Sequence, residues 1–469
     1  MLSLADVVQG LTGVRTAAWE RQPTRVVVDS RHVERGDVFI ALRGEQADGH
    51  DFVGDALARG AAMAVVHRPV EAQAPLVEGA SAAAALPAPL PLLLRVPDTL
   101  TALQELAAFW RRRHSPRVIG VTGSVGKTTT KELISDVLSR RYLTLKSEQS
   151  FNNEIGLPLT LLKLTAEHER VVLEMGMYDV GEIAGLARIA LPHVGVVTII
   201  APVHLERART MERIVQAKSE LVRALPPAPE GVAILNYDDP LVLGMRELTS
   251  ACVMTYGLAP EADLWADDVQ GLGLEGIYFR LHYQGEALHV KVPLLGRHSV
   301  HTVLRAAAVG LVEGLTWQEI VEGLRAPSPQ LRLVAVPGPR GSTILDDTYN
   351  ASPASTIAAL NLLDELGGRK IAVLGDMLEL GDYEREGHEK VGMRALEVVD
   401  LLITVGPRGR IIGETALRWG MPAGQVHMVE DAAAAIDLLE SLVAEDDVVL
   451  VKGSRALRLE QVVAALGRE

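Results

Sequence analysis

The chain has 469 residues, 48% of them hydrophobic, which is more than one hydrophobic core holds, so we expect about three domains. Its formal net charge of −14 argues against a nucleic-acid partner, and its longest apolar run, 194–203, is too short to span a bilayer. The single cysteine, Cys252, excludes an internal disulfide. Since no basic-then-apolar leader is evident, we expect a cytoplasmic protein that neither binds nucleic acid nor inserts into a membrane.

Residues 1–97 mix short predicted strands and helices. The segments 29–31 and 44–50 are polar and directly follow strands, a position that suits ligand groups but equally suits solvated turns. Residues 70–91, rich in Ala and Pro and without periodicity, are predicted to form a flexible surface insertion. Strands are predicted at 25–28, 38–42, 61–66 and 92–96, and a short helix is predicted at 52–59.

A helix is predicted from its cap at Asp98 to about Arg113, and the segment 118–130 follows it. Here an apolar run enters a turn with two glycines and continues into a helix-compatible stretch with a Lys and three hydroxyls. Such a turn presents backbone N–H groups to an anion at a helix N-terminus. The spacing departs from the common P-loop, because Val121 stands where the first Gly is expected. The segment predicts a nucleotide phosphate site, with an ordinary glycine-rich turn as the alternative.

Strands and helices then alternate to about residue 293, which predicts a mostly parallel sheet flanked by helices. Polar groups follow three of the strands: Glu174, then His204 with Glu206, then 236–239. Because ligands of open α/β sheets bind at the carboxyl ends of the strands, these groups should converge with the phosphate loop. The apolar runs predicted as buried strands lie at 118–121, 171–175, 194–200 and 232–235.

Residues 262–293 alternate like short antiparallel strands, and helices are predicted at 298–312 and 317–325. The prolines of 327–329 mark a boundary. A second α/β unit without a phosphate loop follows, with strands predicted at 343–345, 371–374, 401–405 and 448–451. The expected fold class is therefore α/β in three domains: a small N-terminal one, a central P-loop-type one and a C-terminal Rossmann-like one.

Glu174, His204 and Lys218 beside a nucleotide loop suggest phosphoryl transfer assisted by Mg²⁺, which prefers oxygen ligands such as those of Thr128 and Glu174. Taken singly, a Lys in a helical stretch is usually a surface charge and a lone His is usually structural. From the residues alone, the prediction ends at an α/β enzyme that uses ATP and Mg²⁺.

Several segments resemble the Mur ligase family: 122–130, 151–158 (Phe-Asn-Asn-Glu-Ile-Gly-Leu-Pro), 173–176, and 204–206 with 217–220 downstream. Within that family, 346–353, 374–381 and 451–455 resemble the members that add D-alanyl-D-alanine, and 29–31 and 36–42 resemble their uridine-nucleotide domain. The resemblance extends over nearly the whole chain. It implies an enzyme in which ATP phosphorylates the terminal carboxylate of UDP-N-acetylmuramoyl-tripeptide and the amine of D-alanyl-D-alanine attacks the acyl phosphate.

The resemblance also implies residue roles. Two Mg²⁺ ions would be held by Thr128, Glu174, His204 and Lys218, the last carbamylated, and these residues except Thr128 would join Lys127 in catalysis. The nucleotide would contact Gly123, Ser124, Val125, Gly126, Lys127, Thr128, Thr129, Ser299, Thr302, Arg332 and Asp347. The substrates would contact Ser30, Arg31, Asn152, Asn153, Asn350, Ser454 and Arg455.

By the same resemblance, 1–97 would bind the UDP-sugar, 98–326 ATP and Mg²⁺, and 327–469 would close over the nucleotide and receive the dipeptide. We expect a monomer. The chain departs from the family pattern at Ser299, Thr302 and Ser352, where Asn is usual, and at 207–210, where a glycine-bearing loop is usual. The alternatives are a sister ligase that adds a single amino acid and a non-catalytic nucleotide-sugar-binding scaffold.

Overall fold

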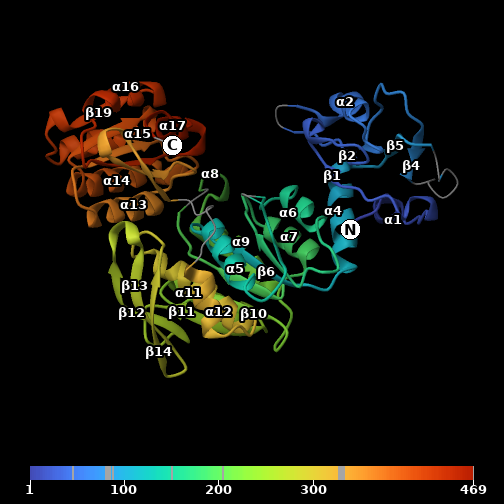
Figure 1. The fold of residues 1–469 in the computed structure, drawn as a ribbon, viewed down its shortest axis with the longest axis horizontal. Coiled ribbons are helices and arrows are strands. Elements are labelled where there is room, and N and C mark those ends of the chain that lie inside the picture. Colours follow the sequence, from blue (N-terminus) through green and yellow to red (C-terminus); the bar gives the residue numbers. More distant parts are fainter. Residues whose placement is uncertain are drawn as a thin grey trace.

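The computed structural model describes residues 1–44, 47–79, 86, 89–148, 151–202, 205–325 and 333–467. The chain folds into three α/β units in sequence order, each built on its own sheet. Figure 1 shows the N-terminal unit (blue) and the C-terminal unit (orange to red) above opposite ends of the central unit. The expected three-domain α/β architecture is confirmed.

The N-terminal sheet is entirely parallel, in the order β1-β2-β3-β5-β4. The prediction for 70–91 is wrong in part, because 76–78 form the edge strand β4 beside β5, with Val77 buried, Leu76 exposed and Glu78 half-buried. A three-residue strand has too few residues to show alternation, so only its pairing reveals it. The elements are α1 (Leu4–Thr12), β1 (Val26–Val27), β2 (Val38–Ile40), α2 (Val53–Ala58), β3 (Met63–Val66), β4 (Leu76–Glu78) and β5 (Leu92–Arg95).

Helix α4 (Thr99–Arg112) joins the first two units. Asp98 caps it by accepting the Thr101 N–H at 2.7 Å, as predicted from the sequence. Its apolar face packs against α1 on one side and against α6 (Gly156–Leu161) and α7 (Glu182–Ala190) on the other. The hydrophobic core therefore continues from the N-terminal unit into the central one.

The central sheet has the order β14-β13-β12-β11-β10-β9-β6-β8-β7 and is parallel from β7 to β12, with β13 and β14 antiparallel. The predicted strands form, but β9 ends at Val197, earlier than expected. The next two residues bond to the phosphate loop instead: Thr198 Oγ1 donates to the Val125 carbonyl, and the Ile199 carbonyl accepts the Ser124 N–H at 2.7 Å. The strands are β6 (Arg117–Thr122), β7 (Thr144–Lys146), β8 (Arg170–Glu174), β9 (Val194–Val197), β10 (Val232–Asn236), β11 (Cys252–Gly257), β12 (Leu264–Gly271), β13 (Ile277–Tyr283) and β14 (Glu286–Val292).

Helices cover both faces of this sheet. One apolar cluster joins it to α5 (Lys127–Leu138), α11 (Ser299–Val312) and α12 (Trp317–Arg325). The other joins it to α4, α6, α7 and α9 (Met211–Arg223). Of the short helices, α8 (Leu205–Ala208) contacts α9, and α10 (Pro240–Leu243) contacts β10.

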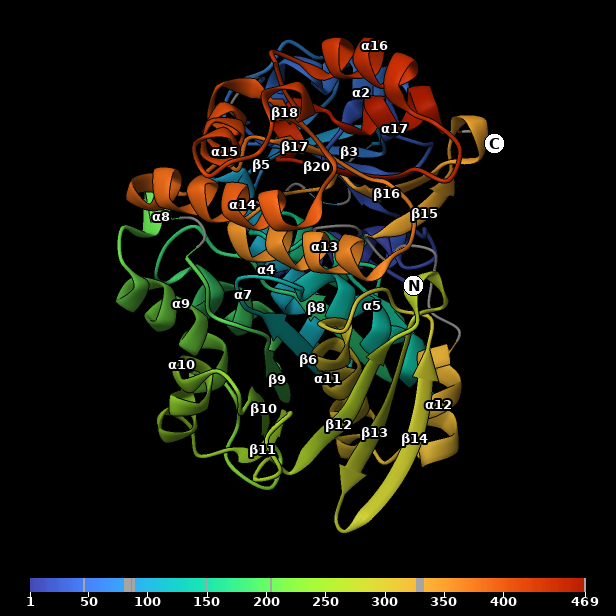
Figure 2. The same cartoon turned by 90° about the vertical axis from the view of Figure 1, so that its left-hand side faces the viewer.

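The C-terminal sheet has the order β15-β16-β20-β17-β18-β19 and is parallel except for β15. Helices α13 and α14 lie on the side that faces the central unit (Figures 1 and 2). In the described part of the chain, no helix is both long and apolar enough to cross a membrane. The elements are β15 (Val334–Pro337), β16 (Thr343–Asp347), α13 (Pro353–Glu365), β17 (Lys370–Gly375), α14 (Glu384–Val398), β18 (Leu401–Val405), α15 (Gly406–Arg418), β19 (Val426–Val429), α16 (Ala432–Leu442), β20 (Val448–Lys452) and α17 (Glu460–Leu466).

Candidate active site

The phosphate loop connects β6 to α5 and depends on two glycines with positive φ. Gly123 has φ of +139°, and a Cβ there would lie 1.9 Å from Thr198 Oγ1. Gly126, with φ of +81°, is the N-cap of α5. No other residue type fits the first position, and the second favours glycine strongly. The loop thus lies directly against the end of β9, with the helix N-terminus open to an anion.

The side chains of the loop bond to the loop itself and to the strand beside it. Lys127 Nζ donates to the carbonyls of Gly123 at 2.9 Å and Ser124 at 3.3 Å. Thr198 Oγ1 donates to the Val125 carbonyl at 2.7 Å. The lysine amino group therefore lies over the turn in which phosphate would bind. The half-buried Thr129 follows on α5.

Thr128 and Glu174 meet beside the loop. Thr128 Oγ1 donates to Glu174 Oε2 at 2.7 Å, and Asn152 Nδ2 donates to Oε1 at 2.8 Å. The carboxylate is 1% exposed, and its backbone N–H bonds to Ser147 Oγ at 3.2 Å. A buried carboxylate beside a hydroxyl is a donor set that Mg²⁺ accepts, so the residues present fit the predicted ion.

Lys218 lies on α9 and is 1% exposed. No hydrogen bond or ion pair joins its amino group to any residue that the structure describes. Burial, and after it the positive charge of Lys127, lowers the pKa of Lys218 well below its ordinary value. The predicted partner His204 lies outside the described residues. Within the described ranges, no three His, Cys, Asp or Glu side chains gather to hold a metal.

Glu220, two residues after Lys218, fixes α9 against α7. Its carboxylate accepts the backbone N–H groups of Gly181 at 2.6 Å and Ala184 at 2.9 Å, at the N-terminus of α7. This role has no local sequence signal beyond the position of Glu220 in a segment that resembles the family. The contact holds the helix that presents Lys218.

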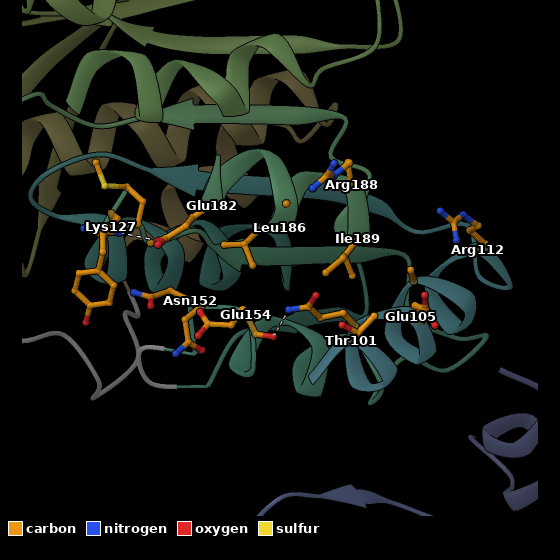
Figure 3. A pocket seen from close by; sticks show the side chains of 17 residues that line it. Thr101, Glu105, Arg112, Lys127, Asn152, Glu154, Glu182, Leu186, Arg188 and Ile189 are labelled. Carbon is orange, nitrogen blue, oxygen red and sulfur yellow. Dashed lines mark hydrogen bonds between the residues drawn. The ribbon is translucent and has the colours of Figure 1, made fainter. Parts of the chain in front are cut away.

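A groove of about 970 Å³ runs from the phosphate loop along α4 and α7. Figure 3 shows Lys127 and Asn152 at one end and Arg188 and Arg112 toward the other. Its length and mixed polar lining suit an extended, charged ligand. The sequence does not predict Glu182, Arg188 and Arg112 as groove residues, because only the packing of α4 beside α7 turns them toward one groove.

The remaining predicted nucleotide residues lie on α11 and the C-terminal unit. Ser299 Oγ donates to the Leu295 carbonyl at 2.7 Å, and Thr302 Oγ1 accepts from Arg305 Nη2 at 2.7 Å, so both hydroxyls already have protein partners. Asp347, at the carboxyl end of β16, pairs with Lys452 Nζ at 2.6 Å. Arg332 lies outside the described residues.

The predicted substrate residues are spread over all three units. In the C-terminal unit, Ser454 is buried and its Oγ accepts the Leu378 N–H at 2.9 Å, and the exposed Arg455 lies 5.6 Å from the Tyr349 ring. Asn350 is exposed, and its backbone carbonyl accepts from Lys452 Nζ at 2.9 Å.

In the central unit, Asn153 lines the groove, and its side chain accepts the Gly156 N–H at 2.9 Å. In the N-terminal unit, Ser30 is buried, and the exposed Arg31 pairs with Asp29 at 2.7 Å. The structure therefore brings Lys127, Thr128, Glu174 and Asn152 together. The predicted nucleotide and substrate residues of the N-terminal and C-terminal units lie apart from these four.

Models of three Mur ligase domains match this chain. The "Mur ligase family, catalytic domain" matches residues 23–111, the "Mur ligase middle domain" matches 121–310, and the "Mur ligase, glutamate ligase domain" matches 331–455. Together they span more than half of the sequence, in the order of the three units.

Whole-length relatives agree. The chain is 36% identical over 448 residues to a UDP-N-acetylmuramoyl-tripeptide--D-alanyl-D-alanine ligase of Bacillus subtilis, covering 94% of this chain and 92% of the relative. A crystal structure of MurF from Acinetobacter baumannii superimposes with a TM-score of 0.84 at 32% identity, covering 98% of this chain and 97% of that one. The crystal structure of MurF from Thermotoga maritima in complex with ADP superimposes with a TM-score of 0.76 at 28% identity, covering 94% of this chain and 96% of that one. The chain therefore belongs to the Mur ligase family.

Proposed function

We propose that this protein is the ATP-dependent ligase that joins D-alanyl-D-alanine to UDP-N-acetylmuramoyl-tripeptide, giving the pentapeptide, ADP and phosphate. The observation that supports this most is the 2.7 Å contact between Thr128 and Glu174 beside the phosphate loop, in a chain 36% identical to a ligase of that name. The groove that leads from this loop offers the length that a nucleotide-linked peptide needs.

The reaction has two steps. A carboxylate oxygen of the tripeptide attacks the γ-phosphorus of ATP and ADP leaves, which gives an acyl phosphate. The dipeptide amine then attacks the acyl carbon, loses a proton, and phosphate departs as the amide forms. The chain's contribution is to position the reactants and neutralise charge: Lys127 and the loop N–H groups hold phosphate oxygens, and Asn152 orients the Glu174 carboxylate.

Mg²⁺ would be held by Thr128 and Glu174 and would neutralise phosphate oxygens. We propose that Lys218 is carbamylated and contributes to a second Mg²⁺ site with His204. Its burial favours the neutral amine, the form that adds to CO₂ and releases a proton to give an anionic carbamate. A carbamate oxygen is a ligand for Mg²⁺, whereas an ammonium is not.

The three units take separate parts in this proposal. Residues 1–97, with Ser30 and Arg31, bind the UDP-sugar, 98–326 bind ATP and metal, and 327–469 bring Arg332 and Asp347 to the nucleotide and Asn350, Ser454 and Arg455 to the dipeptide. The protein acts in the cytoplasm as a monomer.

Phosphate release tests the assignment. The assay contains ATP, Mg²⁺ and UDP-N-acetylmuramoyl-tripeptide, made in parallel with diaminopimelate or lysine as third residue, and receives D-alanyl-D-alanine or single amino acids one at a time. We expect release that requires both the tripeptide and the dipeptide, with a product mass raised by the dipeptide. Release with a single amino acid identifies a sister ligase, and bound nucleotide with no release identifies a scaffold.

A further inference from the structure

Arg305, on α11, is a buried cation without an anionic partner. Its side chain is 5% exposed. Nη2 donates to Thr302 Oγ1 at 2.7 Å and Nη1 to Tyr256 Oη at 3.3 Å, while Nε is buried without a hydrogen-bond partner. Among the residues that the structure describes, no carboxylate lies within ion-pair distance of it. Because both partners are neutral, its positive charge is not compensated within the chain, which is costly in a buried position.

The guanidinium lies beside the phosphate loop. Nη2 is 3.4 Å from the point where a Cβ on Gly126 would stand, and Gly126 is the N-cap of α5. The same guanidinium donates to the Tyr256 hydroxyl, and this hydroxyl donates to the Thr198 carbonyl at 3.0 Å. Thr198 in turn bonds through Oγ1 to the Val125 carbonyl of the loop. Arg305 is thus next to the loop at Gly126, and it is linked to the loop at Val125 by the hydrogen bonds of Tyr256 and Thr198.

We propose that Arg305 is a positioning residue of the nucleotide site, whose charge is neutralised by the phosphate groups bound in the loop. This rests on the proposed use of ATP. Among the described residues this charge beside Gly126 has no carboxylate partner, and a polyanionic ligand bound at the loop would compensate it. Binding of the phosphate chain therefore gains from Arg305, whereas binding of the base and ribose does not.

Binding of ATP, ADP and adenosine to the full chain, measured by calorimetry in Mg²⁺ buffer, tests the proposal. Arg305→Met removes the charge and keeps a long side chain, Arg305→Lys keeps the charge, and Tyr256→Phe removes the hydroxyl link alone. Arg246→Met is the control for net charge, because Arg246 is exposed and forms no ion pair with any described residue.

We expect Arg305→Met to weaken ATP binding by about tenfold or more, the size expected for the loss of one buried charge several ångströms away. The ATP affinity of Arg305→Lys should stay within about threefold of that of the native protein. Tyr256→Phe should lose less ATP affinity than Arg305→Met does. Adenosine affinity and the unliganded unfolding temperature should not fall in Arg305→Met, since an uncompensated buried charge is removed.

ATP affinity in Arg305→Met equal to that of the Arg246→Met control would overturn the proposal. Equal losses for ATP and adenosine, or a loss that Arg305→Lys does not restore, would also overturn it, because they indicate a role in shape alone. None of these measurements requires ligation, so a failed ligation assay with the expected binding results refutes the proposed substrates and not the role of Arg305.

Discussion

At Gly123 the main chain adopts φ of +139°, and a Cβ would meet Thr198 Oγ1 at 1.9 Å. Gly123→Ala must therefore move either the loop or the end of β9. We expect a loss of about 1–3 kcal/mol in the free energy of unfolding, as for one strained backbone position, together with weaker ATP binding. Urea unfolding and calorimetry measure the two effects.

The control for this substitution is Gly244→Ala, since Gly244 has open space around the Cβ position and ordinary helical φ and ψ. It should leave both quantities unchanged. If Gly123→Ala binds ATP as well as Gly244→Ala does, the loop does not depend on that turn.

Among the elements, α7 and α9 are joined by the Glu220 carboxylate at the N-terminus of α7. Glu220→Gln removes the charge and one acceptor oxygen. We expect a loss of about 0.5–2 kcal/mol in the free energy of unfolding, the range of a lost N-terminal cap, and a lower kcat because α9 presents Lys218. Glu247→Gln, at an exposed position, is the matched control. A stable variant with native kcat would contradict the role given to this contact.

Helix α14 contains a fully buried His388 in a fixed tautomer: Nε2 accepts the Met377 N–H at 3.0 Å and Nδ1 donates to the Glu384 carbonyl at 2.6 Å. Burial lowers the pKa of His388 below its ordinary 6.5. The unfolded chain therefore binds this proton more tightly, so the unfolding free energy decreases as the pH falls below about 6.5, by up to about 1.4 kcal/mol per pH unit.

Urea unfolding of the native protein and of His388→Gln, at about pH 7.5 and about pH 5.5, isolates this contribution from that of other histidines. At the higher pH we expect the native protein to have a larger free energy of unfolding than His388→Gln. At the lower pH this difference between the two proteins should shrink. A difference independent of pH would show that His388 does not titrate between the folded and unfolded states.

For the whole molecule, the described contacts between the central and C-terminal units include both polar and apolar ones. The Glu206 N–H bonds to the Glu379 carbonyl at 3.4 Å, Arg297 pairs with Glu365 at 3.3 Å, and Leu295 packs against the C-terminal core. Asp347 stands on the C-terminal unit and the phosphate loop on the central one. We expect closure when an ATP analogue and UDP-N-acetylmuramoyl-tripeptide bind together. Small-angle scattering should show a smaller radius of gyration than for the free protein, and an unchanged radius with both ligands bound would contradict closure.

The sequence by itself determined which segments are buried strands and where the phosphate loop lies. Continuous apolar runs and a glycine turn before a helix are local signals, and they predicted β6, β8 and β10 together with the loop. Edge strands such as β4 and β7 were missed, because short, partly exposed strands depend on their neighbours for pairing rather than on their own pattern.

Only the tertiary structure decided which side chains meet. The sequence suggested that Thr128 and Glu174 converge, since both follow parallel strands, and the structure gives the contact its distance and its third partner, Asn152. The groove between α4 and α7 and the unpaired Arg305 beside Gly126 have no local signature. Burial and charge compensation are properties of neighbours distant in sequence, and they exist only once the helices have packed onto the sheet.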